Sequence, residues 1–294
     1  MTPRPIDLKA LSDAEALPIH DFLNATRAEL LPDDPPIPLS ERLTSWRNPS
    51  PREWSKTFAV YDNERVIGFA EADWESTDQE NPDKAWMNLT VTPSLRRQGL
   101  GSTLLRTLLE ACRADGKQQL FLATNDRIPE GKAFAQQIGA KFGQEEHTNQ
   151  LLFTDLNRDY LERALRNAPT DQFEIGFYDT DLPEAELEPI CRLIEVMNTA
   201  PRGDLEFNDF KVTPEDLLDD ARQAKINGLE RWFLYVRERA SGRYAGYTET
   251  GFHPNRSHLV NQWGTGVLPE FRGHGLGAWI KSAMIERILR ERPR

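Results

Sequence analysis

The feature that most constrains the fold of this chain is an internal repeat. The segment Val91–Gly101 aligns without gaps with Val267–Gly277, at an offset of 176 residues. Val, Pro, Arg, Gly, Leu and Gly occupy the same positions in both segments, and apolar residues follow each copy at the spacing of one helix face. Because a repeat of this kind marks duplicated structural units, we expect two domains of one fold.

The segments upstream of the repeat also correspond between the two halves. Each half has two helical patterns followed by two strand-like runs, with Gly68 and Gly246 at equivalent points on the second run. The helical patterns cover residues 14–30, 39–48, 183–198 and 213–226, and the strand-like runs are Thr57–Tyr61, Arg65–Glu71, Trp232–Arg237 and Tyr244–Glu249. The order β-α-α-β-β-β-α in each half predicts an α+β class with a mixed sheet.

Further patterns set the expected domain boundaries. A strand is expected at Gln119–Thr124, a helix near 129–138, and strand-like runs at 141–147 and 150–156. We therefore predict an N-terminal domain over residues 1–156, a polar helical linker over 157–170, and a C-terminal domain over 171–294.

Composition excludes several classes of protein. The 294 residues suit two domains of ordinary size, and 38% of them are hydrophobic. The net charge of -11 and the lack of a long basic run argue against nucleic-acid binding. No run of the ~20 apolar residues needed to span a bilayer is present, and the two cysteines lie far apart. These features predict a cytoplasmic protein with no membrane partner, no disulfide framework and no metal site.

The chemistry of the repeat lies in its glycines. Between a strand and a helix, Arg-x-x-Gly-x-Gly lets the chain turn tightly and lets a bulky anion approach the main chain. The first turn of a helix adds unpaired N–H donors and the positive end of the helix dipole, so the turn favours phosphate or diphosphate. The alternative is a purely structural turn, and two copies favour phosphate binding. Neither copy supplies the lysine of a P-loop or the third glycine of a dinucleotide fingerprint.

The motif strand-Val-x-Pro-x-x-Arg-x-x-Gly-x-Gly-helix resembles the acetyl-CoA signature of the GNAT superfamily of N-acetyltransferases, and the two-domain arrangement resembles that of tandem GNAT proteins such as the mycothiol synthases. The resemblance implies that main-chain groups hold the diphosphate and that Val91 and Val267 bond the pantetheine or acetyl carbonyl. It implies a first cradle of Arg97, Gln98, Gly99, Leu100, Gly101 and Ser102 and a second of Gly273, His274, Gly275, Leu276, Gly277 and Ala278. Arg96 and Arg272 would either add charge beside the diphosphate or pin the turn.

Two departures from the family pattern stand out. Ala135 occupies the position where these enzymes often carry a tyrosine that protonates the leaving thiolate, so either water does so or the first domain is catalytically degenerate, which we favour. The chain stops at Arg294, before the fifth strand of the second domain. We expect this domain to be C-terminally incomplete, as in a truncated chain. The alternative is a homodimer, in which a second chain completes the sheet.

Candidates for a general base are Glu71 and Asp73 in the first copy and Glu249 in the second. The pattern alone favours ordinary solvent-facing strand carboxylates for all three. The expected function is transfer of an acetyl group from acetyl-CoA to a primary amine of a small molecule by direct attack. The alternative is an acyl-CoA-binding module in which one or both halves are inactive.

Overall fold

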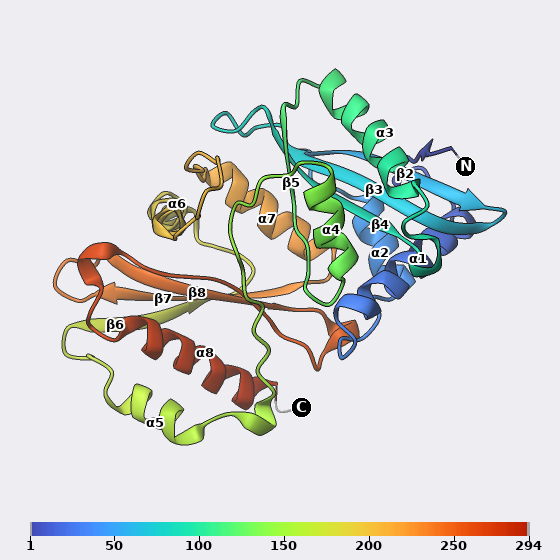
Figure 1. Ribbon diagram of the computed structural model, residues 1–294. Helices are drawn as coiled ribbons and strands as arrows, with labels where there is room; N and C mark the ends of the chain where they lie inside the picture. Colours follow the sequence, from blue (N-terminus) through green and yellow to red (C-terminus); the bar gives the residue numbers. More distant parts are fainter. Residues whose placement is uncertain (1, 293–294) are drawn as a thin grey trace. The chain divides into compact units, whose positions relative to one another are not determined.

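The computed structural model describes residues 2–292, so the outermost residues of the expected domains, 1, 293 and 294, lie outside it. The chain divides into two compact units, Met1–Lys141 and Phe142–Arg294. Each unit contains one sheet with helices packed against it (Figure 1). The two units are described in turn, each by itself.

The first unit is built on a five-stranded sheet in the order β1-β2-β3-β4-β5. Its elements are β1 (Arg4–Pro5), α1 (Asp13–Leu30), α2 (Leu39–Arg47), β2 (Glu53–Asp62), β3 (Arg65–Glu75), β4 (Lys84–Val91), α3 (Leu100–Ala114), β5 (Gln119–Leu122) and α4 (Pro129–Gln137). The strands are antiparallel except for β4 and β5, which are parallel. This is the mixed sheet that the sequence predicts.

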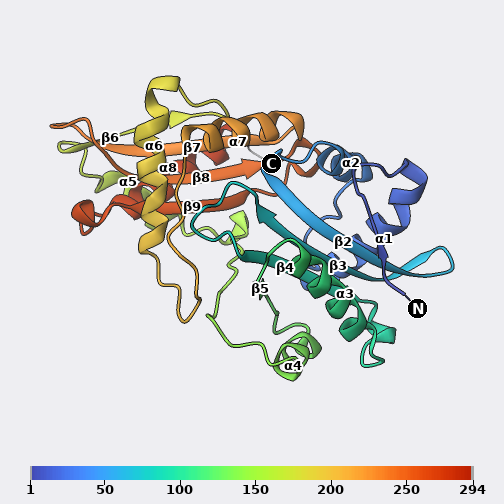
Figure 2. The same cartoon turned by 90° about the horizontal axis from the view of Figure 1, so that it is seen from above.

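Helices cover both faces of the first sheet because its strands alternate two apolar sets (Figure 2). Leu104 and Leu108 of α3 pack with Ala70 of β3 on one face. Ile19 and Phe22 of α1, with Phe69, the residue before Ala70 on β3, form the core on the other face. A capping box at the start of α1 satisfies its first amides. Alternate residues of β3 therefore face α3 and α1 in turn.

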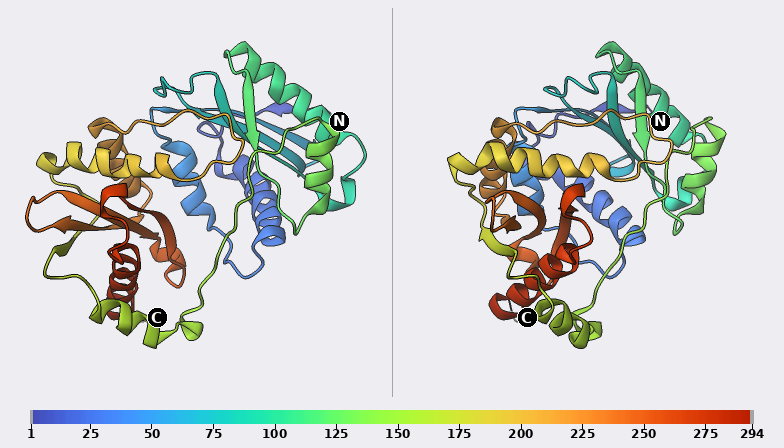
Figure 3. Two further views of the ribbon diagram at one scale, coloured as in Figure 1. Left: turned by 60° about the vertical axis from the view of Figure 1, so that its left-hand side comes forward. Right: turned by 90° about the vertical axis from the view of Figure 1, so that its left-hand side faces the viewer.

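The second unit has a four-stranded antiparallel sheet in the order β6-β7-β8-β9. Its elements are α5 (Arg158–Arg166), β6 (Phe173–Tyr178), α6 (Leu187–Ile194), α7 (Pro214–Ile226), β7 (Glu230–Glu238), β8 (Tyr244–Phe252), β9 (Asn261–Val267) and α8 (Leu276–Glu291). Figure 3 shows α6, in yellow, and α8, in red, on opposite sides of the orange strands. The helix α5 confirms that the stretch after residue 157 is helical.

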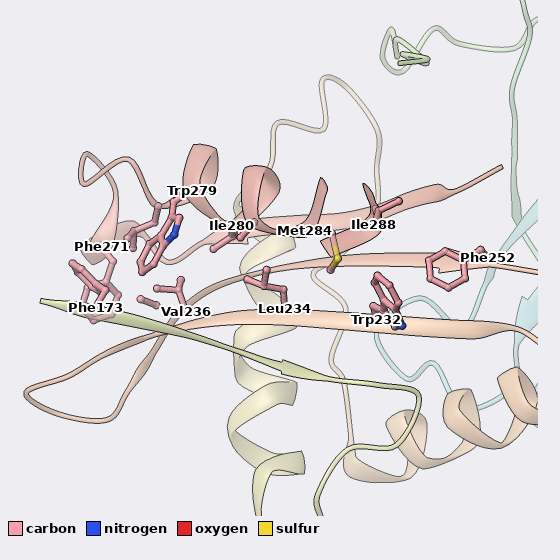
Figure 4. Close-up of a cluster of buried hydrophobic side chains, with 13 residues drawn as sticks. Phe173, Trp232, Leu234, Val236, Phe252, Phe271, Trp279, Ile280, Met284 and Ile288 are labelled. Atoms are coloured by element: carbon pink, nitrogen blue, oxygen red, sulfur yellow. The ribbon is translucent and has the colours of Figure 1, made fainter. Parts of the chain in front are cut away.

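The core between α8 and the second sheet is large and mainly apolar. Ile280 and Met284 of α8 point toward Trp232 and Leu234 of β7 (Figure 4). All four side chains are at most 2% exposed. Such burial contributes roughly 1.5–3 kcal/mol for each aliphatic side chain, so this core holds α8 against the sheet.

Strand register shows that the two units are copies of one fold. Gly68 lies opposite Val91, and Gly246 lies opposite Val267. The same two glycines also lie opposite the last residue before a bulge in the neighbouring strand, in β2 and in β7. The glycine equivalence inferred from the sequence is therefore confirmed.

The strand-like runs at 141–147 and 150–156 are not strands. This stretch is irregular except for a short 3-10 helix, Phe153–Asp155. Phe142 and Leu152 are exposed there, 73% and 63% respectively. Alternating apolar residues predict a strand only where a neighbouring strand supplies hydrogen bonds, and none pairs with this stretch among residues 2–292.

Candidate functional site

The glycine-rich turns have the same backbone shape in both units. In the first unit a short turn, Pro93–Leu95, follows β4, and α3 then begins with Gly99 as its N-cap. Gly99 has φ +84° and Arg97 has φ +62°. The equivalent Gly275 and Gly273 have φ +75° and +86°. Left-handed residues in such turns bring successive amide groups to one side, as in anion-binding nests.

The first main-chain amides of α3 and α8 have no acceptor within their own helix. The first bonds of α3 and α8 are donated by Thr103 N to Gly99 O, at 3.0 Å, and by Trp279 N to Gly275 O, at 3.1 Å. The amides before these donors have no intrahelical acceptor and lie at the positive end of the helix dipole. A Cβ added at Gly99 or Gly275 would meet no protein atom within 4 Å. The space beside each glycine is therefore open to a diphosphate, so both turns fit the group that the sequence predicts.

Arg96 and Arg272 pin these turns. The Nε of Arg96 donates to the carbonyl of Val91 at 3.1 Å, and the Nε of Arg272 donates to that of Val267 at 3.0 Å. Arg96 also donates to both carboxylate oxygens of Glu29, at 2.7 and 2.5 Å. This geometry supports the pinning role for both arginines. Sequence reasoning missed Glu29 as the partner of Arg96, since it lies far away along the chain on α1.

The motif valines end strands with an open edge. β4 pairs with β5 only over Lys84–Met87, so the last residues of β4, up to Val91, have β3 as their one strand neighbour in the described chain. β9 likewise pairs only with β8 among residues 2–292. Free main-chain groups at such an edge can bond an extended ligand. Val91 and Val267 lie at these edges, beside the turns, and their bonding to pantetheine or an acetyl carbonyl stays a prediction.

Glu71 and Asp73 lie on the face of β3 that α1 covers, with an alternation that places them on the same side as Phe69. Burial, together with the neighbouring charge of Asp73, raises the pKa of Glu71 to about 7. Burial and the charge of Glu53 raise the pKa of Asp73 to about 6. The Thr57 hydroxyl donates to Glu71 Oε1 at 3.3 Å. A carboxyl that titrates near neutral pH can both accept and release a proton.

Glu249 has the equivalent position on β8 but a different environment. Arg231 of β7 donates to Glu249 Oε1 from Nε at 2.9 Å and from Nη2 at 2.5 Å. Burial raises the pKa of Glu249, and the charge of Arg231 opposes this shift. The sequence identified Glu249 but not Arg231, because strand pairing and not local spacing brings them together. The charge of the Glu249 carboxylate is therefore balanced by the Arg231 guanidinium of the same unit.

The remaining site residues have structural surroundings. The ring of His274 packs against Phe173, with 5.4 Å between ring centroids, so its side chain supports the second turn. Ala135 lies on α4 as expected, and it supplies no proton. Within residues 2–292 no helix has the length and apolarity to cross a membrane. In the same range, no group of three or more His, Cys, Asp and Glu residues could hold a metal ion.

Comparison with known proteins agrees with this geometry. Residues 19–139 match the family model described as the Acetyltransferase (GNAT) family. A search of curated proteins finds no match. Among solved structures, a tandem GNAT protein from the clavulanic acid biosynthesis pathway superposes with a TM-score of 0.71 at 20% identity, covering 99% of this chain and 86% of that one. A GCN5-related N-acetyltransferase from Sphaerobacter thermophilus gives a TM-score of 0.64 at 14% identity, covering 98% and 83%.

The structural likenesses establish the fold of both units. The chain has the fold of tandem GNAT proteins, and residues 19–139 of its first unit match the acetyltransferase (GNAT) family model.

Proposed function

We propose that the protein transfers an acetyl group from acetyl-CoA to a primary amine of a small molecule in the cytoplasm, and that the first unit carries the reaction. The observation that carries this proposal is the contrast between two equivalent carboxylates. Glu71 forms no ion pair among residues 2–292 and has a pKa of about 7, whereas Glu249 is held by Arg231. Only the first unit thus combines a phosphate-binding turn with a carboxylate that can accept a proton near neutral pH.

The binding step would use the main chain. The amides from Arg97 to Ser102 would hold the diphosphate, with Arg96 keeping the turn in shape through Val91 and Glu29. The open edge of β4 beside Val91 would bond the pantetheine chain. Acetyl-CoA supplies the acyl thioester, and a main-chain donor at its carbonyl oxygen would stabilise the charge that develops there.

The proton step would use Glu71. A protonated acceptor amine is not nucleophilic, so one proton must leave its nitrogen before attack. Glu71 would take that proton, directly or through one water. The neutral amine then forms the new C–N bond as the C–S bond breaks. The proton that the nitrogen loses on becoming an amide passes through water to the released thiolate, since Ala135 provides none. Asp73 and Glu53 would hold the cationic amine by charge attraction.

The second unit fits a different role. It has the same turn, with Gly273 and Gly275 in left-handed conformation, but its carboxylate is paired. We propose that this unit binds acyl-CoA without turnover. The pairing of a second chain with the edge of β9, which would give a homodimer, remains a prediction.

Release of free CoA in the presence of a panel of amines tests the catalytic proposal. Polyamines, amino sugars, aminoglycosides and peptide N-termini span the classes of primary amine. We expect at least one to release CoA from the wild-type protein and Glu71→Gln to slow this release by about 10²–10⁴-fold. If no amine triggers release while calorimetry detects acetyl-CoA binding, the chain is a binding module and the enzyme proposal is wrong.

A further inference from the structure

The neighbours of the two equivalent carboxylates differ in a way that changes their charge. Strand register makes Ser55, Thr57 and Asp73 around Glu71 equivalent to Arg231, Phe233 and Gly251 around Glu249. The first set adds one negative charge and no positive charge; the positive charge that does act on Glu71 comes from Arg42 of α2 and has the smallest effect on its pKa. The second set adds one positive charge and removes the second carboxylate. Both sets lie on the sheet face that carries the carboxylate, because they stand directly or diagonally opposite it.

Arg231 is held as a bound cation would be. Its guanidinium donates twice to Glu249 and lies 3.8 Å from Asp220. Its Cζ lies 5.7 Å from the centroid of the Trp263 ring, within the range of a cation–π contact. The side chains of Arg231 and Glu249 are only 19% and 12% exposed. Carboxylate on one side and indole on another is a chemical environment that suits an ammonium or guanidinium ligand.

Gly251 makes room for the aromatic part of this environment. A Cβ added at Gly251 would lie 2.2 Å from Cη2 of Trp263, so the ring occupies the space that a side chain would take. At the equivalent position the first unit has Asp73. The two differences between the units therefore act together. Glycine in place of Asp73 removes a negative charge and leaves space for the indole ring, and arginine in place of Ser55 supplies the cation.

We infer that Arg231 occupies, in the second unit, the position that the cationic nitrogen of an acceptor takes beside Glu71 in the first unit. The inference builds on the proposed function of the first unit. The Arg231 side chain thus prevents an acceptor from binding beside Glu249 in the second unit. Once this side chain is removed, the site beside Glu249 binds alkylguanidinium or alkylammonium cations.

The test is a thermal-melting titration that needs no catalysis, so its outcome is independent of whether an acceptor is found. All variants carry Glu71→Gln, which removes one carboxylate of the competing cation site in the first unit and leaves Asp73 and Glu53 the same in every variant. Adding Arg231→Ala should lower a melting transition by about 5–10 °C, because it leaves Glu249 partly buried without its partner. Ethylguanidinium chloride at millimolar concentration should restore most of this loss in a saturable manner, and ethylammonium chloride should restore part of it. Sodium chloride at equal ionic strength should not.

Three controls define the outcome. Glu71→Gln alone sets the baseline, because Arg231 fills the site in the second unit and any response then comes from Asp73 and Glu53 of the first unit. Glu71→Gln with Arg243→Ala, which breaks the exposed pair of Arg243 with Glu270, should not respond beyond this baseline. Adding Glu249→Gln to the Arg231→Ala variant should abolish the rescue. If Arg231→Ala does not fold alone, refolding yield with and without ethylguanidinium replaces melting as the readout. Absence of saturable rescue, or rescue that survives Glu249→Gln, overturns the inference.

Discussion

Replacing Glu71 by Gln should stabilise the protein at pH 8, whereas the same replacement at Glu249 should destabilise it. The two residues are equivalent in the fold, and each change removes one negative charge and keeps the side-chain shape. Glu71 has its pKa raised from 4.5 to about 7. Its folded form therefore holds a proton that the unfolded chain has already lost between these two pH values.

The sign follows from this proton. The favourable contribution of protonated Glu71 is fully present below pH 4.5 and is lost as the pH rises through about 7. The shift from 4.5 to about 7 corresponds to a ceiling of about 3 kcal/mol at pH 8, since one pKa unit is worth about 1.4 kcal/mol. Glutamine has no charge, so it avoids the free-energy cost of burying an ionised carboxylate at pH 8. The difference in the free energy of unfolding between Glu71→Gln and wild type should thus be small at pH 4.5 and grow toward pH 8.

Glu249→Gln has the opposite effect because it leaves the partly buried Arg231 without its anionic partner. Arg231 is 19% exposed and donates two hydrogen bonds to Glu249. Removing one partner of a buried pair costs about 3 kcal/mol or more at neutral pH. Urea unfolding of both variants and wild type at pH 4.5, 6 and 8 measures these differences. If both variants shift the free energy of unfolding in the same direction at pH 8, our reasoning on the two carboxylates is refuted.

Three further predictions concern the first turn. Gly99→Val should abolish measurable acetyl-CoA binding in calorimetry but cost only about 1–2 kcal/mol of stability, because φ is +84° and no protein atom lies near its Cβ position; Gly116→Val, with φ +80° and equally open space, should cost the same stability and leave affinity unchanged. Arg97→Gly should raise the free energy of unfolding by about 0.5–1 kcal/mol, because Arg97 has φ +62°; a decrease in urea unfolding would contradict the assigned backbone. Arg96→Ala should weaken acetyl-CoA binding about tenfold, a loss near 1.4 kcal/mol, as the turn loses its bonds to Val91 and Glu29; exposed Arg106→Ala on α3 is its control, and equal affinities of the two variants would argue against pinning.

The sequence predicted the parts of the fold that depend on residues close together along the chain. The Gly99 and Gly275 turns, the helices that follow them and the mixed sheet of the first unit were predictable, because glycine spacing and apolar periodicity indicate backbone shape directly. The duplication strengthened this prediction, since an isolated turn of the same kind would have left the structural alternative open.

The sequence did not predict the contacts that only pairing creates. The bond from Arg96 to Glu29 joins residues 67 positions apart, and Arg231 meets Glu249 only because β7 and β8 are adjacent. Neither pair has a local signal. The runs at 141–147 and 150–156 show the converse error, because they have the alternation of strands but no neighbouring strand to bond among residues 2–292.

The two turns and the two carboxylate environments differ in how they tolerate mutational drift. The turn works through main-chain amides, so Gln98 can correspond to His274 and Ser102 to Ala278 with the donors intact. The carboxylate environment works through side chains, and exchanges at two positions, Ser55 to Arg231 and Asp73 to Gly251, are enough to reverse its charge. After duplication, a copy of such a fold would therefore need fewer substitutions to lose the ability to bind an acceptor amine than to lose the ability to bind a diphosphate.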